Sequence, residues 1–118
     1  MSASLVMVNL DGPDPRAQAA FYGALLDWTI VHSEDEYAMI SGVGAPIGFG
    51  RVDGYVPPPW PDPEARKRYH LDLGVADLAA ATQRAVELGA TVPDEQPGEG
   101  RWTVLLDPVG HPFCLCQQ

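Results

Sequence analysis

Hydrophobic and polar positions in the first half of the chain predict a strand followed by a helix. Apolar side chains in residues 5–11 recur with a period of two, as on a half-buried strand. Asp14, followed by proline, is typical of a helix start, because its carboxylate can accept from free amide groups of the first turn. The buried stripe predicted for this helix comprises Ala17, Ala20, Phe21, Ala24, Leu25 and Trp28.

The same order returns 63 residues later, with Asp77 in the place of Asp14. A second alternating run at 69–75 predicts a strand, residues 78–88 predict a helix, and Gly89 is a typical helix end. A repeat with a fixed period predicts two copies of one supersecondary unit.

Short strand-like runs follow each predicted helix. They lie at 28–32, 36–41 and 46–52 in the first half, and near 90–93, at 101–107 and at 112–117 in the second. The repeated unit is therefore strand–helix–strand–strand–strand, or βαβββ. Two copies predict an α+β fold with eight strands in two curved mixed sheets around a central cup.

A proline-rich segment separates the two copies. Residues 53–66 contain five prolines, which rules out a regular helix or central strand there. We expect one domain of 118 residues, with modules at 1–53 and 68–118 joined by a connector at 54–67.

Alternation also predicts which side chains face away from the helices. On the first strand of each module and on the last strand, one face is apolar and the other is mixed. The mixed set consists of Met7, Asn9, His70, Asp72 and Cys114. Polar groups on an inward face are typical of a binding pocket, although they could also satisfy one another in a closed core.

Composition restricts the partners. A net charge of −9 opposes nucleic-acid binding, because phosphate backbones would be repelled. It would favour cationic ligands if acids line the pocket, or it could serve solubility alone. The absence of a long apolar run predicts no membrane span. Cys114 and Cys116 lie two residues apart on a predicted strand, about 6.5 Å or more between Cα atoms, which disfavours a mutual disulfide and favours reduced thiols in the cytoplasm.

Three motifs carry a resemblance to a known family. They are FYGALLDW in the first half, HLDLGVADLAAATQRAVELGA in the second, and the closing DPVGHPFCL. With these motifs the chain resembles the vicinal oxygen chelate (VOC) superfamily, which includes glyoxalase I, extradiol dioxygenases, and fosfomycin- and bleomycin-resistance proteins. The resemblance covers nearly the whole chain and implies paired βαβββ modules and a homodimer.

The resemblance also implies four metal-ligand positions, and this chain departs from the expected residues. The positions fall on Met7, Gly50, His70 and Cys114, with Gly48 as an alternative to Gly50. Only His70 is a usual ligand, so we expect no metal at an intact family site. The alternative is a lyase, isomerase or dioxygenase that binds zinc, nickel, iron or manganese with substitute ligands; the substitutes on the same faces are Asn9, Asp72 and Cys116.

Without a metal, the resemblance to bleomycin-resistance proteins implies binding of a small hydrophobic or cationic molecule. Tyr55, Trp60 and Trp102 are the candidate stacking residues, beside His70 as a polar anchor. Trp60 could equally fix the connector, and Trp102 could belong to the core. A third hypothesis is a metal-free catalyst, with His70 as base, oriented by a neighbouring carboxylate, and Cys114 as nucleophile.

Overall fold

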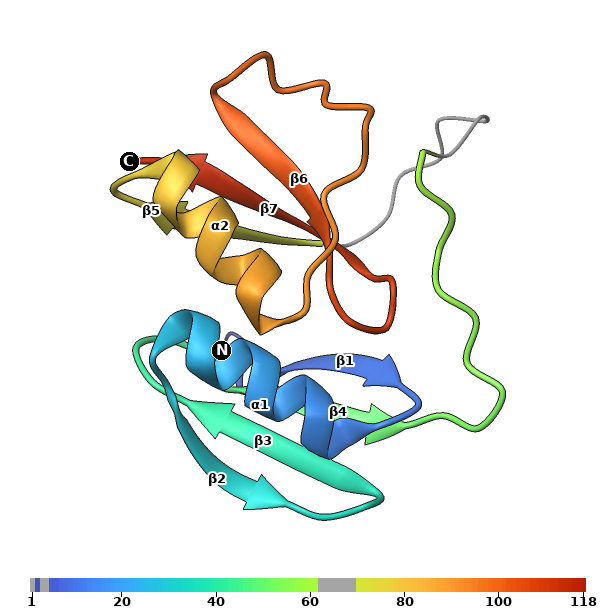
Figure 1. The fold of residues 1–118 in the computed structure, drawn as a ribbon. Coiled ribbons are helices and arrows are strands. Elements are labelled where there is room, and N and C mark those ends of the chain that lie inside the picture. Colours follow the sequence, from blue (N-terminus) through green and yellow to red (C-terminus); the bar gives the residue numbers. More distant parts are fainter. Residues whose placement is uncertain (1, 3–4, 62–69) are drawn as a thin grey trace. The chain divides into compact units, whose positions relative to one another are not determined.

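The computed structural model describes residue 2, residues 5–61 and residues 70–118. Within these ranges the chain forms two helices and seven strands (Figure 1). Contacts divide it into two compact units, Met1–Val56 and Pro57–Gln118, so each unit contains one repeat. Parts of two predicted segments, the connector at 62–67 and the first residue of the strand at 69–75, lie outside the described residues.

The first unit is a four-stranded mixed sheet with one helix. Its elements are β1 (Val8–Gly12), α1 (Pro15–Leu26), β2 (Thr29–Ser33), β3 (Tyr37–Ser41) and β4 (Ile47–Arg51). The strand order is β1-β4-β3-β2, in which β1 runs parallel to β4 and the other neighbours are antiparallel. All five predicted elements are present.

Side chains at both ends of α1 explain its boundaries. The Asp14 carboxylate accepts a hydrogen bond from the Ala17 amide at 3.2 Å, and Pro15 occupies the first turn. Asp27 ends the helix in the left-handed conformation, at φ 56°. The residues from which the ends of this helix were predicted therefore have the expected conformations and contacts in the structure.

The buried stripe of α1 differs from the predicted one. Ala17, Ala20 and Ala24 are exposed, whereas Gln18 and Tyr22 are buried. The Tyr22 ring stacks on Phe49 of β4, with centroids 5.8 Å apart. Phe21, which was predicted in the stripe, and Ala19 are buried as well. The helix face that carries the large rings therefore meets the sheet, and the three predicted alanines lie outside it.

The second unit is a three-stranded mixed sheet with one helix. Its elements are β5 (Leu71–Val75), α2 (Leu78–Leu88), β6 (Trp102–Leu106) and β7 (Pro112–Gln117). The strand order is β5-β7-β6, with β5 parallel and β6 antiparallel to β7. Asp77 caps α2 through the Ala80 amide at 3.0 Å, and Gly89 ends it at φ 118°.

The predicted strand near 90–93 is reduced to a single bridge between Thr91 and Leu106. Pro93 has no amide hydrogen to continue the ladder. The side-chain amide of Gln96 hydrogen-bonds to the backbone of Val104 in place of a neighbouring strand. Its Oε1 accepts from the Val104 amide at 2.8 Å, and its Nε2 donates to the Val104 carbonyl at 2.9 Å. Seven strands therefore form in the described chain instead of eight.

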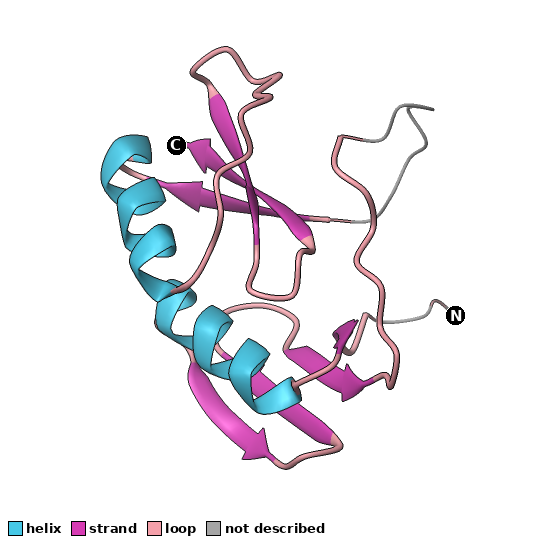
Figure 2. Ribbon diagram, turned by 45° about the vertical axis from the view of Figure 1, so that its right-hand side comes forward, coloured by secondary structure: helices cyan, strands magenta, loops and turns pink. Residues whose placement is uncertain are grey.

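Each helix covers one face of its own sheet (Figure 2). In the first unit Leu10 and Phe49 are buried, and in the second Phe113 and Leu115 are buried. We call the sheet face opposite the helix the distal face. Because side chains alternate along a strand, the predicted mixed residues of both modules belong to the distal faces.

Candidate functional site

Three side chains of the second unit converge on its distal face. Asp72 of β5 and Cys114 of β7 are register partners in the parallel pair, so their side chains project to the same side. His70 lies one residue before β5, and its Nε2 is 3.1 Å from Oδ1 of Asp72. One ligand atom from each of His70, Asp72 and Cys114 lies within 4.8 Å of the others.

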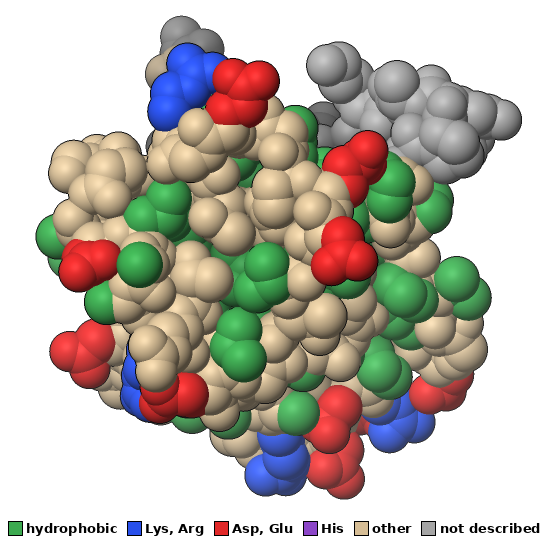
Figure 3. Space-filling view, turned by 45° about the horizontal axis from the view of Figure 1, so that its top comes forward, with side chains coloured by type: hydrophobic (Ala, Val, Ile, Leu, Met, Phe, Trp, Pro, Cys, Tyr) green, Lys and Arg blue, Asp and Glu red, His purple; other side chains and the backbone are tan. Residues whose placement is uncertain are grey.

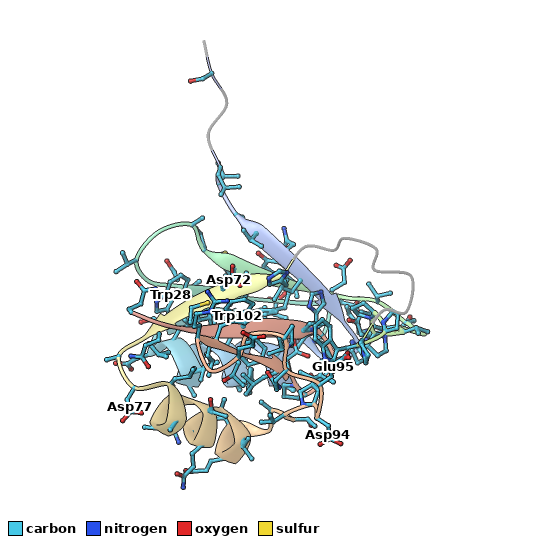
Figure 4. All side chains as sticks on the ribbon, turned by 90° about the horizontal axis from the view of Figure 1, so that it is seen from above. Trp28, Asp72, Asp77, Asp94, Glu95 and Trp102 are labelled. Carbon is cyan, nitrogen blue, oxygen red and sulfur yellow. The ribbon has the colours of Figure 1, made fainter. Side chains whose placement is uncertain are left out.

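These side chains form the floor of a pocket of about 430 Å³ that lies entirely in the second unit. The pocket is lined by Trp60, His70, Asp72, Pro97, Trp102, Val104, Pro112, Cys114 and Cys116. Five of the residues predicted as site residues are thus brought together. Figure 4 labels Asp72 and Trp102, which come from β5 and β6, the two outer strands of this sheet.

Two tryptophans provide the aromatic lining. Trp60 and Trp102 are half-buried, and among the described residues the buried Trp60 Nε1 has no hydrogen-bond partner. The guanidinium of Arg101 lies 5.3 Å from the Trp102 ring centroid. Trp102 therefore already makes one cation–π contact, the type of interaction that a cationic ligand would use.

Sequence reasoning missed the role of Gly98. A Cβ added there would lie 2.3 Å from the Trp102 carbonyl oxygen and 2.8 Å from Cδ2 of the Trp102 ring. Glycine is therefore needed for the loop to approach the aromatic lining. The only sequence signal was the glycine-rich loop at 95–100, which indicates a turn but not what the turn contacts.

Burial and a neighbouring carboxylate keep the Cys114 thiol protonated. Burial first, and then the negative charge of Asp72, raises the pKa of Cys114 from 9.0 to about 11. The thiol also hydrogen-bonds to Asp72, which favours the protonated form. Burial and Asp72 also raise the pKa of Cys116. At neutral pH the two thiols of the pocket are therefore uncharged.

The remaining predicted site residues belong to the first unit. Met7 Sδ accepts a hydrogen bond from the Tyr37 hydroxyl at 3.3 Å. Both side chains, together with Asn9, close over Gly48: a Cβ there would lie 2.4 Å from Asn9 Oδ1, 2.8 Å from Met7 Sδ and 2.9 Å from Tyr37 Oη. Tyr37 was missed, although the alternation of 37–41 places it on the distal face, with Ala38 and Ile40 buried.

Gly50 and Tyr55 also lie in the first unit. A Cβ added at Gly50 would have Asp11 Oδ1 as its nearest neighbour at 3.6 Å, so the backbone leaves room for a side chain that the sequence does not supply. Tyr55 is half-buried and is not among the residues that line the second-unit pocket.

Charged side chains are dispersed over one face of the molecule. On the face drawn in Figure 3, acidic side chains are scattered among hydrophobic and uncharged ones, with a few basic side chains between them. Neither helix in the described ranges is long and apolar enough to cross a membrane. The acidic side chains are therefore spread over this face and do not gather at one place on it.

Comparison with known proteins agrees with the repeat and the motifs. Residues 7–116 match the glyoxalase-like domain family, and no curated protein shows significant similarity to the chain. The chain therefore belongs to the glyoxalase-like domain family, within the VOC superfamily, as the sequence resemblance implied.

Solved structures share the fold at low sequence identity. A glyoxalase/bleomycin resistance protein/dioxygenase family enzyme from Burkholderia phytofirmans PsJN has a TM-score of 0.76 at 18% identity, over 98% of both chains. A glyoxalase-related enzyme from Fulvimarina pelagi has a TM-score of 0.71 at 20% identity, over 99% of this chain and 89% of that one.

A third structure contains a metal. It is a mutant of the fosfomycin resistance protein FosX from Listeria monocytogenes, complexed with Mn(II) and 1S,2S-dihydroxypropylphosphonic acid. Its TM-score is 0.71 at 21% identity, over 98% of this chain and 90% of that one. These likenesses confirm the α+β fold of paired modules.

The residues of this chain do not fit a hard divalent ion at the four positions implied by the family. Met7 offers a soft thioether and Gly50 offers no side chain, whereas manganese prefers carboxylate, carbonyl and water oxygens. Cys114 offers a sulfur ligand rather than an oxygen ligand.

Proposed function

We propose that this protein binds a small hydrophobic or cationic molecule in the pocket of its second unit. The observation that carries the proposal is the combination of Trp60 and Trp102 with the carboxylate of Asp72 in one pocket. Aromatic faces stack on planar ligands and attract cations, and a nearby carboxylate adds to that attraction. The volume of about 430 Å³ is within the usual range for small-molecule sites.

The floor of the pocket would set the orientation of the ligand. His70 has two ring nitrogens to offer and its side chain is 44% exposed, so it remains accessible to a ligand. The Cys114 thiol is buried and protonated, and it contributes a compact, weakly polar surface. The affinity would come mainly from the apolar lining, and the preference for a positive charge from Asp72.

Calorimetric titration with a matched pair of probes tests this proposal. We expect 1-methylquinolinium to bind more tightly than its neutral analogue 1-methylnaphthalene. Asp72→Asn should weaken binding of the cation about tenfold, equivalent to about 1.4 kcal/mol, and leave the neutral probe nearly unchanged. Asp94→Asn is the matched control, because Asp94 is an exposed acid of the same unit that does not line the pocket.

A second readout uses the tryptophans. Ligand binding should quench the fluorescence of Trp60 and Trp102, and the double variant Trp60→Phe/Trp102→Phe should retain only the signal of Trp28. If neither probe binds and quenching is absent across hydrophobic and cationic compounds, the proposed function is wrong.

The metal-free catalyst has less support. A thiolate, not a thiol, is the attacking species, and the raised pKa of Cys114 keeps it protonated at neutral pH. We therefore do not assign Cys114 the role of nucleophile.

We also infer that the protein is a cytoplasmic homodimer. The two cysteines are free, as expected for a reducing compartment, and the dimer is implied by the family resemblance. Size-exclusion chromatography with light scattering should give twice the mass of the 12.7 kDa chain. A single-chain mass at micromolar concentration would contradict the dimer.

A further inference from the structure

We infer that Gly110 is a positioning residue for the pocket: through its contact with Pro57 it holds Trp60 in place as part of the lining. Neither Gly110 nor Pro57 lines the pocket, whereas Trp60 does. The two residues therefore act on a ligand through Trp60. This inference rests on the proposed function and deepens it, because it assigns the residues that set the affinity for planar ligands.

Covalent geometry makes the segment from Pro57 to Trp60 stiff. Its sequence is Pro-Pro-Pro-Trp, and Pro61 follows. Each proline fixes its own φ at about −65°, and a residue that precedes a proline is restricted to extended conformations. The segment forms neither helix nor strand, and an extended polyproline run of this length spans about 9 Å. A displacement of Pro57 is therefore transmitted to Trp60.

The turn between β6 and β7 is the support on which this segment rests. Asp107 is 3% exposed. Its Oδ1 accepts hydrogen bonds from the Val109 amide at 3.0 Å and from the His111 amide at 2.8 Å. The Gly110 amide donates to the Asp107 carbonyl at 2.9 Å. These bonds fix the conformation of the turn and, with it, the place of Gly110.

The absence of a side chain at Gly110 allows Pro57 to lie directly against the turn. Gly110 has φ 87°, and a Cβ added there would lie 2.8 Å from Cβ and 3.0 Å from Cγ of Pro57. A side chain at this position would therefore displace Pro57. Three residues further along, Trp60 lines the pocket, and its indole Nε1 is buried. A stiff segment that begins on the turn thus holds the Trp60 ring in the lining.

A ring that is already in position favours binding of flat molecules. A tryptophan that moved freely would lose conformational freedom when a ligand stacked on it, and that loss would reduce the affinity. Stacking on Trp60 acts on cationic and neutral ring systems alike. The carboxylate of Asp72, in contrast, favours positive charge only. Loss of the contact between Gly110 and Pro57 should therefore weaken the binding of both kinds of ligand.

Calorimetry of single and double variants tests the inference. Trp60→Ala should weaken the binding of 1-methylquinolinium and of 1-methylnaphthalene about tenfold each, and Gly110→Ala about three- to tenfold each. In the Trp60→Ala background, Gly110→Ala should change either affinity by less than about twofold, because substitutions that act through one contact are not additive.

Gly44→Ala is the matched control for backbone strain. Gly44 lies in the first unit, has φ 94°, and has nothing within 4 Å of an added Cβ. An alanine there adopts the same unfavourable backbone region as in Gly110→Ala but displaces no neighbour. It should leave both affinities unchanged.

A fluorescence measurement reports on Trp60 without any ligand. In the double variant Trp28→Phe/Trp102→Phe, Trp60 is the single tryptophan. Adding Gly110→Ala should increase quenching of Trp60 by acrylamide, whereas adding Gly44→Ala should not. Pro57→Gly removes the ring that rests on the turn and loosens the segment, so it should also increase the quenching. Circular dichroism checks folding, and Pro57→Gly carries the test if Gly110→Ala does not fold.

Three results would overturn the inference. They are additive losses of affinity in Gly110→Ala and Trp60→Ala, a loss confined to the cationic probe, and unchanged quenching of Trp60 in Gly110→Ala and Pro57→Gly. If both probes bind and the quenching does not change, the positioning role is wrong and the proposed function stands. If neither probe binds but the quenching increases as expected, the proposed function is wrong, and Gly110 still positions Trp60.

Discussion

The two units share one order of elements but carry different chemistry on their distal faces. In the first unit Met7, Asn9 and Tyr37 close over Gly48. In the second, His70, Asp72 and Cys114 lie on the floor of a pocket with aromatic lining. The repeat therefore determines the backbone, whereas the chemistry depends on a few alternate positions that can change without altering the fold.

The two distal faces also differ in how closely their side chains pack. At Gly48 three side chains approach the backbone so closely that an added Cβ would force them to move. At the register pair of Asp72 and Cys114, both positions carry side chains that line an open pocket. Four predictions test the comparison: two concern what the units share, the core and the helix ends, and two concern the contrast between a filled distal face and an open one.

The largest effect should come from the shared architecture, the aromatic core on the helix side. Phe49→Ala in the first unit and Phe113→Ala in the second each remove a fully buried ring. Each should lower the free energy of unfolding by about 3–5 kcal/mol, measured by urea denaturation. An effect below 1 kcal/mol at either position would mean that the two cores are not equivalent.

The filled distal face of the first unit should be sensitive to one methyl group. Gly48→Ala places a Cβ within 3 Å of three side chains and should cost about 1–3 kcal/mol of stability. Gly50→Ala is the matched control, with its nearest contact at 3.6 Å, and should be nearly neutral. Thermal unfolding measures both, and equal effects would contradict the close packing over Gly48.

The open distal face of the second unit should be visible in thiol chemistry. Because burial and Asp72 raise the pKa of Cys114 to about 11, its alkylation should be slow at pH 8 and accelerate up to about pH 11. Asp72→Asn removes a charge that disfavours the thiolate, so the pH profile should move to lower pH by up to about one pKa unit, or 1.4 kcal/mol. Alkylation of the metal-free protein, followed by mass spectrometry, measures the profile; an unchanged midpoint would exclude the Asp72 contact.

The smallest effect concerns the helix ends, where the two repeats differ by one residue. Asp27 adopts φ 56°, a conformation that Gly89 provides without a Cβ in the second unit. Asp27→Gly should stabilise the protein by about 0.5–1 kcal/mol, whereas Gly89→Ala should destabilise it by at least about 1 kcal/mol. Destabilisation by Asp27→Gly would show that the Asp27 side chain has a compensating role.

The sequence predicted elements best where a chemical signal marks their ends. Helix 78–88 was predicted at its observed bounds because Asp77 and Gly89 flank it. The first strand begins at Val8, later than predicted, and Val6 is 75% exposed. The alternating pattern continued beyond the part of the chain that finds a partner strand, and only pairing with β4 determines where β1 starts.

The part of the candidate site that depends on strand alternation was predictable from the sequence. Alternation placed His70, Asp72 and Cys114 on one face, and the strand register brings them into contact. The approach of Trp60 and the close packing of Gly98 against Trp102 depend on loop conformations, which have no periodic signal in the sequence. The buried stripe of α1 was misassigned because alanine fits either face of a helix.

The amide of Gln96 has a consequence for solubility. β6 is the last strand of its sheet, and an exposed edge strand can recruit a strand from another chain. On this edge the backbone groups of Val104 are occupied by Gln96, and those of Leu106 by Thr91. One side chain and one bridge thus protect the β6 edge of this sheet against pairing with a strand of another chain.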